Sequence, residues 1–182
     1  MGLNHSFRRC ERMQRIIILG NAGSGKSTLA RRLGTYLALP VVHLDLLFWE
    51  AGWKEPEAEV FRDRVRAAIS GEKWICEGNY ARRTFDLRLP RADVVIWLDT
   101  PRLVCAGRVA LRSALQRNRA DLPAGCREKL DAEFLAFLRY VWNFDSQSRP
   151  RIEIERQKQV PLVPVVRLRG NRQISSFITS LR

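Results

Sequence analysis

The sequence is poor in cysteine and histidine and contains no long apolar run. Four of its 182 residues are cysteine, two are histidine, and no two cysteines form a C-x-x-C pair, so we expect no structural zinc site. Unpaired cysteines spread along a chain are typical of the reducing cytoplasm, where we expect this protein to act. No stretch approaches the roughly 20 apolar residues that a membrane span requires. Internal repeats and helix-turn-helix or zinc-finger signatures are absent too, which disfavours the common DNA-binding modules.

Acidic residues are scarce relative to basic ones. The chain has 19 aspartates and glutamates against 32 lysines and arginines, and its formal net charge is +13. Most of the basic residues are arginine, which favours bidentate contacts with phosphate but does not distinguish a nucleotide from a polynucleotide. Residues 1–14 contain Arg8, Arg9 and Arg12 without an apolar segment, so we expect a flexible basic extension rather than a secretory signal. Residues 15–182 are expected to form one domain.

The most informative motif follows the first apolar run. Residues 15–19 read Arg-Ile-Ile-Ile-Leu, as expected of a buried parallel strand, and residues 20–27 fit the G-x-x-x-x-G-K-[ST] pattern of a phosphate-binding loop. Three glycines allow a tight turn in which successive N–H groups converge on an anion. Lys26 is expected to reach the β- and γ-phosphates of a nucleoside triphosphate, and the Ser27 hydroxyl to bind Mg²⁺. The predicted nucleotide-binding residues are Gly20, Asn21, Ala22, Gly23, Ser24, Gly25, Lys26, Ser27 and Thr28.

Strand and helix patterns alternate along the rest of the chain. The alternation predicts an α/β fold of the P-loop NTPase class, with three layers (α/β/α) and a five-stranded, mostly parallel sheet. A stripe of apolar residues in the helix expected over 126–143 is interpreted as core. The further expected strands are 41–44, 73–76, 92–99 and 162–168, and the other expected helices are 25–38, 56–70, one starting at residues 100–101, and 172–181.

Acidic residues stand at the ends of three expected strands, as Asp45, Glu77 and Asp99. Ligands of parallel α/β sheets bind outside the carboxyl ends of the strands. Asp45 is therefore a candidate for accepting a proton or for binding Mg²⁺ through water. An aspartate after a strand is also a common N-cap of a helix, so both interpretations stay open at this stage.

The connection after Asp45 is unusually aromatic. Trp49 and Trp53 flank a glycine within residues 46–54. Two tryptophans so placed are as compatible with the wall of a substrate pocket as with a cap on the hydrophobic core.

Arginines are concentrated between residues 81 and 119, where nine of them stand against three aspartates, a net charge of +6. Arg108, Arg112 and Arg119 share one helical face. Like charges so placed repel one another, and an anion bound opposite would offset that repulsion. We expect residues 118–125 to be a short lid that closes over a nucleotide. The alternatives are a solvated basic face or a surface that contacts DNA.

Several short motifs are spread along the chain from residue 20 onward. They are residues 20–27, His43-Leu44-Asp45 with Trp49 and Trp53, Glu77-Gly78-Asn79-Tyr80, Leu98–Arg102 with Cys105 and Arg108, and residues 125–126, 133–135 and 149–150. Together these motifs resemble the DNA topology modulation proteins (FlaR-like), a family related to adenylate kinase and other small P-loop kinases. The relationship implies that Glu77 organises Mg²⁺-bound water, and that Arg82 or Arg83 clamps a phosphate. It also implies that Arg108 and Arg112 contact the nucleotide base and the transferring phosphoryl group.

These observations predict a cytoplasmic, Mg²⁺-dependent phosphotransferase that uses ATP. Its acceptor would be a small molecule, such as a nucleotide or nucleoside, and no membrane partner is expected. Two alternatives remain: a nucleotide-binding regulator associated with DNA, and an NTPase without a dedicated acceptor. The predicted catalytic residues are Lys26, Asp45, Arg108 and Arg112; Ser27, Asp45 and Glu77 are the predicted metal site, and Trp49, Trp53, Asn79, Arg82 and Arg83 the acceptor site.

Overall fold

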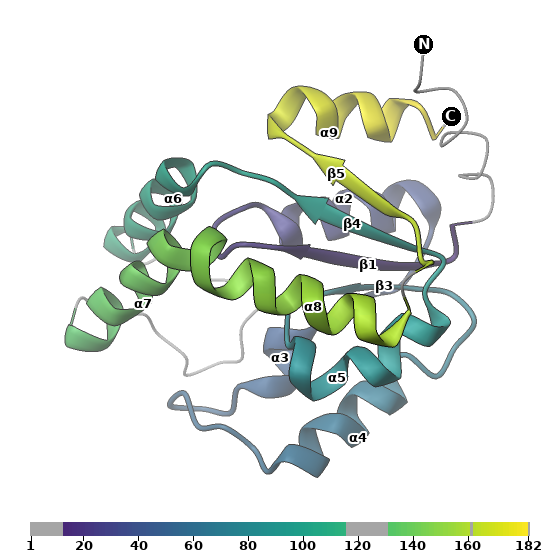
Figure 1. Cartoon of the computed structure of the whole chain (residues 1–182), viewed down its shortest axis with the longest axis horizontal. Coiled ribbons are helices and arrows are strands. Elements are labelled where there is room, and N and C mark those ends of the chain that lie inside the picture. Colours follow the sequence, from purple (N-terminus) through teal and green to yellow (C-terminus); the bar gives the residue numbers. More distant parts are fainter. Residues whose placement is uncertain (1–12, 116–130, 161, 182) are drawn as a thin grey trace.

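A five-stranded parallel sheet forms the centre of the computed structural model, which describes residues 13–115, 131–160 and 162–181 (Figure 1). The strand order is β2-β3-β1-β4-β5, and every strand pair is parallel. The predicted α/β fold with three layers is therefore confirmed. The strands are β1 (Arg15–Gly20), β2 (Val41–His43), β3 (Trp74–Glu77), β4 (Val94–Leu98) and β5 (Val165–Leu168).

The central strands are buried on both faces, which explains their continuous apolar sequences. All residues of β3 and β4 are buried, as are all but the first of β1. On one face, Ile16 and Ile18 pack with Leu29 and Leu33 of α2 and with Phe177 of α9. The helices of this layer are α2 (Lys26–Leu37) and α9 (Gly170–Thr179).

The opposite face of the sheet is covered by four further helices (Figure 1). Ile17 and Leu19 of β1 pack there in one cluster with Phe61, Phe85 and Ile152. The helices are α3 (Leu44–Phe48), α4 (Ala58–Ala68), α5 (Ala81–Arg88) and α8 (Arg149–Gln159). A short 3₁₀ turn (Leu89–Arg91) follows α5, and a π-helical turn (Phe144–Ser148) precedes α8.

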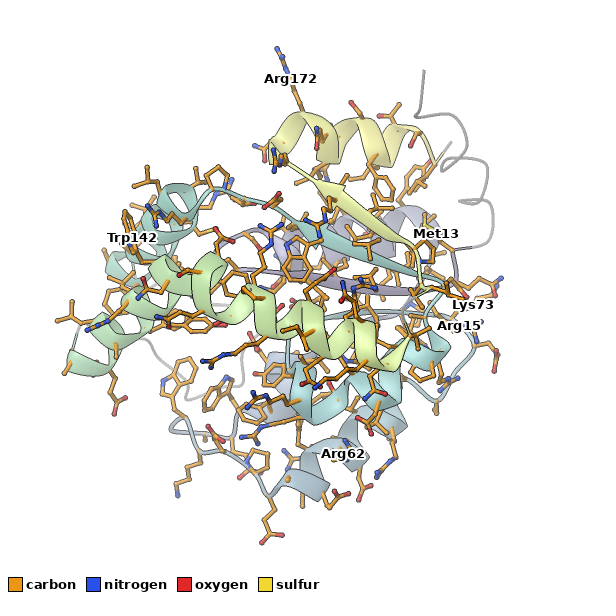
Figure 2. The ribbon with its side chains drawn as sticks, viewed as in Figure 1. Met13, Arg15, Arg62, Lys73, Trp142 and Arg172 are labelled. Carbon is orange, nitrogen blue, oxygen red and sulfur yellow. The ribbon has the colours of Figure 1, made fainter. Side chains whose placement is uncertain are left out.

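Two helices, α6 (Arg102–Ala114) and α7 (Ala132–Asn143), pack against each other beyond the carboxyl ends of the strands. Cys105, Val109 and Val141 form their buried contact, which also includes Ala22 of the phosphate-binding loop. Figure 2 shows Trp142 at this end of the molecule and Lys73, which precedes β3, at the opposite end. The loop is thus supported from the side by α6 and α7.

Three helices are absent from the sequence prediction: α3, α5 and α8. Helix α5 has the sequence ARRTFDLR, and its buried side consists of Thr84, Phe85 and Arg88, so it lacks an apolar stripe. Helix α3 follows β2 without a turn residue and was predicted as the end of a strand and a connection. The stripe predicted as core on α7 is only partly buried, because Trp142 is 41% exposed and lies under the guanidinium of Arg102.

Part of the prediction lies outside the described residues: the basic extension except for residues 13 and 14, and the lid at residues 118–125 with Arg119. Among the residues that are described, no helix is both long enough and apolar enough to cross a bilayer.

Candidate functional site

The phosphate-binding loop has the backbone conformation that its glycines were predicted to provide. The φ angles of Gly20, Gly23 and Gly25 are 148°, 75° and 101°, values that residues with a side chain rarely adopt. A Cβ atom on Gly23 would lie 2.5 Å from the carbonyl oxygen of Cys105, and one on Gly20 would lie 2.8 Å from that of Leu98. The loop therefore needs glycine both for its turn and for its close approach to β4 and α6.

Hydrogen bonds from neighbouring elements hold this loop open as a cradle. The Lys26 ammonium donates to the carbonyl oxygen of Asn21 at 3.0 Å, and Thr100 Oγ1 donates to that of Ser24 at 3.1 Å. Arg108 of α6 donates to the carbonyl oxygens of Gly23 and Ser24 at 3.3 and 3.4 Å. These bonds fix the carbonyl oxygens of the loop, and a glycine-rich turn with fixed carbonyls is the kind of backbone whose remaining N–H groups can bind an anion.

Glu77 is a buried carboxylate next to the loop. It is 2% exposed, and its Oε1 lies 2.8 Å from Nδ1 of His43. Burial alone would raise the pKa of Glu77, but the hydrogen bond with His43, the charge of Lys26 and a hydrogen bond with Ser27 hold this pKa below its ordinary value. Glu77 is therefore ionised beside the residue predicted to bind Mg²⁺.

Asp45 lies in the first turn of α3 rather than directly at the end of a strand. Its Oδ1 accepts a hydrogen bond of 2.8 Å from the hydroxyl of Tyr80. The N-cap of α3 is His43, and no side chain caps that helix, so the N-cap interpretation of Asp45 is wrong. Tyr80 itself has a φ of 35°, a left-handed conformation that directs the chain from β3 into α5.

Asn79 joins the segment after β3 to the phosphate-binding loop. Its Oδ1 accepts from the N–H of Gly20 at 3.2 Å, and its Nδ2 donates to the carbonyl oxygen of Gly20 at 2.9 Å. Both polar atoms of this side chain are thus used to hold the first residue of the loop. Asn79 was predicted to bind the acceptor, and the structure adds this structural contact.

Arg88 is a fully buried arginine that the sequence prediction missed. Its guanidinium donates to the carbonyl oxygens of Gly78 and Asn79, at 3.1 and 2.6 Å, and to Thr84 Oγ1 at 3.0 Å. Burial lowers the pKa of Arg88, although the nearby Cys76, Glu77 and Tyr80 oppose that shift. The side chain therefore fixes residues 77–80, from which Glu77, Asn79 and Tyr80 reach the site. Nothing in the sequence distinguishes it from the other arginines of this stretch.

Most of the predicted site residues line one cavity of about 1960 Å³ at the carboxyl ends of the strands. The cavity extends from the phosphate-binding loop, past Glu77 and Asp45, to Trp49 and Trp53. The rings of these two tryptophans meet edge to face, with centroids 5.2 Å apart, and Trp49 also packs against Phe48 of the core. The predicted residues in the lining are Ala22, Gly23, Ser24, Gly25, Lys26, Ser27, Thr28, Asp45, Trp49, Trp53, Glu77, Asn79, Arg108 and Arg112.

Two predicted acceptor-binding residues, Arg82 and Arg83, are not in the cavity lining. Arg82 is exposed on α5. Arg83 forms an ion pair with Glu55 at 3.0 Å, and its guanidinium lies 4.9 Å from the ring centroid of Phe48. The family resemblance implies that one of the two clamps a phosphate, but neither side chain lines the cavity in this structure.

Asp99 also differs from the other two strand-end acids. Its carboxylate is bound by Arg149 at 2.8 Å and by Arg169 at 2.9 Å. Burial raises the pKa of Asp99, but these two guanidinium groups outweigh burial and hold it below its ordinary value. Asp99 therefore links β4 to α8 and to the segment before α9, and it is not part of the cavity lining.

No protein-family model matches this chain. It is 30% identical over 129 residues to the cytidylate kinase of Pyrococcus horikoshii and 30% identical over 125 residues to that of Pyrococcus furiosus. Each match covers 62% of this chain, and the chain spans 65% of the length of each relative. The structure resembles shikimate kinase from Bacteroides thetaiotaomicron with a TM-score of 0.57 and 18% identity, over 93% of this chain and 97% of that one. The chain thus has the fold of P-loop kinases.

Proposed function

We propose that the protein is an ATP-dependent, Mg²⁺-dependent phosphotransferase that acts on a small molecule. One observation carries this proposal: a single cavity joins the phosphate-binding loop and Lys26 to the carboxylates of Asp45 and Glu77 and to an aromatic wall. A loop that binds a triphosphate needs only one end of such a cavity, and the other end offers room for an acceptor. The similarity to cytidylate kinases supports the same conclusion.

In the proposed reaction, an acceptor hydroxyl oxygen attacks the γ-phosphorus of ATP. A bond forms between these two atoms, the bond from the γ-phosphorus to the β–γ bridging oxygen breaks, and ADP leaves. Asp45 accepts the proton of the hydroxyl. Lys26, Arg108 and Arg112 offset charge on the phosphoryl oxygens, because phosphoryl transfer depends mainly on positioning and electrostatic stabilisation.

The residues around Ser27 are suited to Mg²⁺. Mg²⁺ in kinases is held by one or two protein oxygens together with phosphates and water. Ser27 supplies a hydroxyl, and the ionised Glu77 lies beside it. Among the described residues, no cluster of three or more His, Cys, Asp or Glu side chains could hold a metal, which agrees with a cation shared with the nucleotide. When bound, the ion would neutralise charge on the β- and γ-phosphates.

The contact between His43 and Glu77 predicts the pH dependence of this site. Replacing His43 with leucine removes the hydrogen bond that opposes burial, so the pKa of Glu77 should rise. The acidic limb of the kcat/KM profile should then move to higher pH. His43→Gln retains a hydrogen-bond donor and should move the limb less. An identical profile for wild type and His43→Leu would contradict a role for ionised Glu77.

The same contact affects stability. The pKa of Glu77 is lower in the folded protein than in the unfolded chain. At pH values above the unfolded-state pKa, the ionised carboxylate therefore stabilises the fold. That contribution is lost as the pH falls through the folded pKa. Urea unfolding at a series of acidic pH values would measure it, and the pH dependence should be weaker in His43→Leu.

The proposed activity is tested with a panel of acceptors and Mg·ATP. Nucleosides, nucleotides and hydroxylated metabolites would be offered singly, and both ADP and the phosphorylated product would be measured. Stimulation of ADP release by an acceptor, with an equal amount of phosphorylated product, is the expected result. ADP release that no acceptor stimulates would instead favour the NTPase without a dedicated acceptor.

A second candidate function is favoured by the net charge of +13. The resemblance to the DNA topology modulation proteins suggests that the protein binds nucleotide as a DNA-associated regulator. This candidate predicts DNA binding whose affinity falls steeply with salt, because phosphate contacts release counterions. Absence of binding near physiological ionic strength would remove it. For both candidates we propose a cytoplasmic location, where Cys76 and Cys105, which are free and buried, would stay reduced.

A further inference from the structure

Tyr80 has a backbone conformation that is costly for a residue with a side chain. Its φ of 35° lies in the left-handed region, and in the described part of the chain only Ala38 and Trp53 share that region among the residues other than glycine. Glycine or asparagine would adopt this conformation at lower cost. Strained backbone of this kind persists where the surrounding structure holds it, and it is concentrated at functional sites. A tyrosine at this turn therefore points to a role for its side chain.

Hydrogen bonds on both sides of Tyr80 hold this turn in place. The carbonyl oxygen of Tyr80 accepts from the N–H groups of Arg83 and Thr84 and from Thr84 Oγ1, each at 3.1 Å. The preceding carbonyl oxygen, that of Asn79, accepts from the buried guanidinium of Arg88 at 2.6 Å. The Tyr80 side chain therefore leaves the backbone at a fixed point, and it lines the cavity together with Asn79.

The side chain of Tyr80 contacts two residues of α3. Its ring centroid lies 4.8 Å from that of Phe48, and its hydroxyl donates to Asp45 Oδ1 at 2.8 Å. Asp45 and Phe48 are three residues apart, so they lie on the same face of the helix. The ring also packs against Phe61 of α4, with centroids 5.1 Å apart. Because Phe48 and Phe61 are both buried, the ring is firmly held and presents its hydroxyl to Asp45.

From these contacts we propose that Tyr80 is a positioning residue for phosphoryl transfer and that it acts through Asp45. A carboxylate rotates about its Cβ–Cγ bond, and a hydrogen bond to one of its oxygens restricts that rotation. This restriction keeps Asp45 oriented toward the acceptor hydroxyl, because a proton acceptor must lie within hydrogen-bond distance of the proton that it takes. In the transfer, the acceptor proton passes to Asp45, while Tyr80 retains its own proton. This inference rests on the phosphotransferase activity proposed above.

The first test is Tyr80→Phe, which removes the hydroxyl but retains the ring. With Mg·ATP and the best acceptor, kcat should fall by about 10- to 100-fold, because a misplaced base loses much of its contribution to catalysis. KM for the acceptor should change by less than about twofold, since the lost interaction acts in the transition state. Unchanged kcat would overturn the inference and leave the phosphotransferase activity intact. A rise in KM alone would also overturn it, because Tyr80 would then bind the acceptor directly.

The matched control is Tyr36→Phe. Tyr36 is an exposed tyrosine of α2 that does not line the cavity, so the same chemical change should leave kcat as it is in the wild type. Circular dichroism should show that both variants are folded at the assay temperature. An equal loss of kcat in Tyr36→Phe and Tyr80→Phe would overturn the role given to the position of Tyr80.

A double-mutant cycle distinguishes action through Asp45 from a general structural role. Asp45→Asn removes the proton acceptor but keeps the size of the side chain. In that background Tyr80→Phe should lower kcat by less than about twofold, because residues that act as a unit show non-additive losses. If Tyr80→Phe lowered kcat by the same factor in both backgrounds, Tyr80 would not act through Asp45, and the inference would be wrong.

Hydrolysis of Mg·ATP provides the same comparison if the wild type phosphorylates no acceptor of the panel. Water then takes the place of the acceptor hydroxyl, so the phosphotransferase proposal fails while the coupling of Tyr80 to Asp45 is still measured. ADP release should fall in Tyr80→Phe and show the same non-additivity with Asp45→Asn. Equal ADP release in wild type and Tyr80→Phe would overturn the inference, and a wild type without any turnover would overturn both proposals.

Discussion

Replacing Lys26 with alanine is expected to lower the rate of phosphoryl transfer by about 10²- to 10³-fold, the usual effect of removing one preorganised group that stabilises transition-state charge. The Lys26 ammonium is bound to the carbonyl oxygen of Asn21 at 3.0 Å and borders the cavity. It is thus held at the mouth of the loop before any nucleotide arrives. Turnover is measured as product formation with the best acceptor of the panel.

The matched control for this prediction is Lys73→Ala. Lys73 is an exposed lysine at the opposite end of the molecule (Figure 2), so the control changes net charge by the same amount without touching the cavity. Circular dichroism should show that both variants are folded. Full turnover in Lys26→Ala would reject the phosphotransferase assignment. An equal loss in both variants would show that net charge, and not the position of Lys26, is responsible.

The second large effect is expected on stability, from Arg88→Met. Methionine fills a similar volume but leaves the carbonyl oxygens of Gly78 and Asn79 and the Thr84 hydroxyl without their buried donor. Loss of a buried cation relieves a desolvation cost, yet unsatisfied buried acceptors cost more when several are left at once. We expect the free energy of unfolding to fall by about 3 kcal/mol. For a chain of this size, this corresponds to roughly 6–12 °C in Tm.

Catalysis should be affected by Arg88→Met at temperatures where the variant is still folded. Residues 77–80 hold Glu77 and the contacts of Asn79 to Gly20 and of Tyr80 to Asp45, so kcat should fall more than KM rises. Arg88→Lys retains the charge but fewer donors, and it should be intermediate. Arg82→Met, on the exposed side of the same helix, is the control and should leave Tm nearly unchanged. Wild-type stability in Arg88→Met would show that the relief of desolvation balances the lost hydrogen bonds.

Local features of the chain were sufficient to predict the central parts of the fold. A run of isoleucines can be buried on both faces of a sheet, and the spacing of Gly20, Gly23 and Gly25 before Lys26 is compatible with few structures other than a phosphate-binding loop. Of the helices that were missed, α5 and α8 have polar residues on their buried side, and α3 is only five residues long. Their stability comes from tertiary contacts, which the periodicity of apolar residues in the sequence does not reveal.

The candidate site was only partly predictable for a related reason. Asp45, Glu77 and Asp99 occupy equivalent places in the sequence pattern, each at or just beyond the end of a strand. In the sheet, β2 and β3 are neighbours with His43 in register with Glu77, and Glu77 interacts with Lys26 and Ser27 of the loop. Asp99 is instead neutralised by Arg149 and Arg169, which lie 50 and 70 residues further along the chain. Strand order and register decide which of three similar acids can take part in chemistry.

By itself, the sequence determined the α/β alternation, the phosphate-binding loop and the arginine-rich character of residues 81–119, because each of these depends on residues close together in the chain. Only the tertiary structure decided the partners of the charged side chains. It paired Arg83 with Glu55, buried Arg88 against the carbonyl oxygens of residues 78 and 79, and placed Trp49 and Trp53 together on the cavity wall. The role of a charged side chain depends on which groups lie within a few ångströms of it. For the arginines of this chain, the packing of helices on the sheet decides which groups those are.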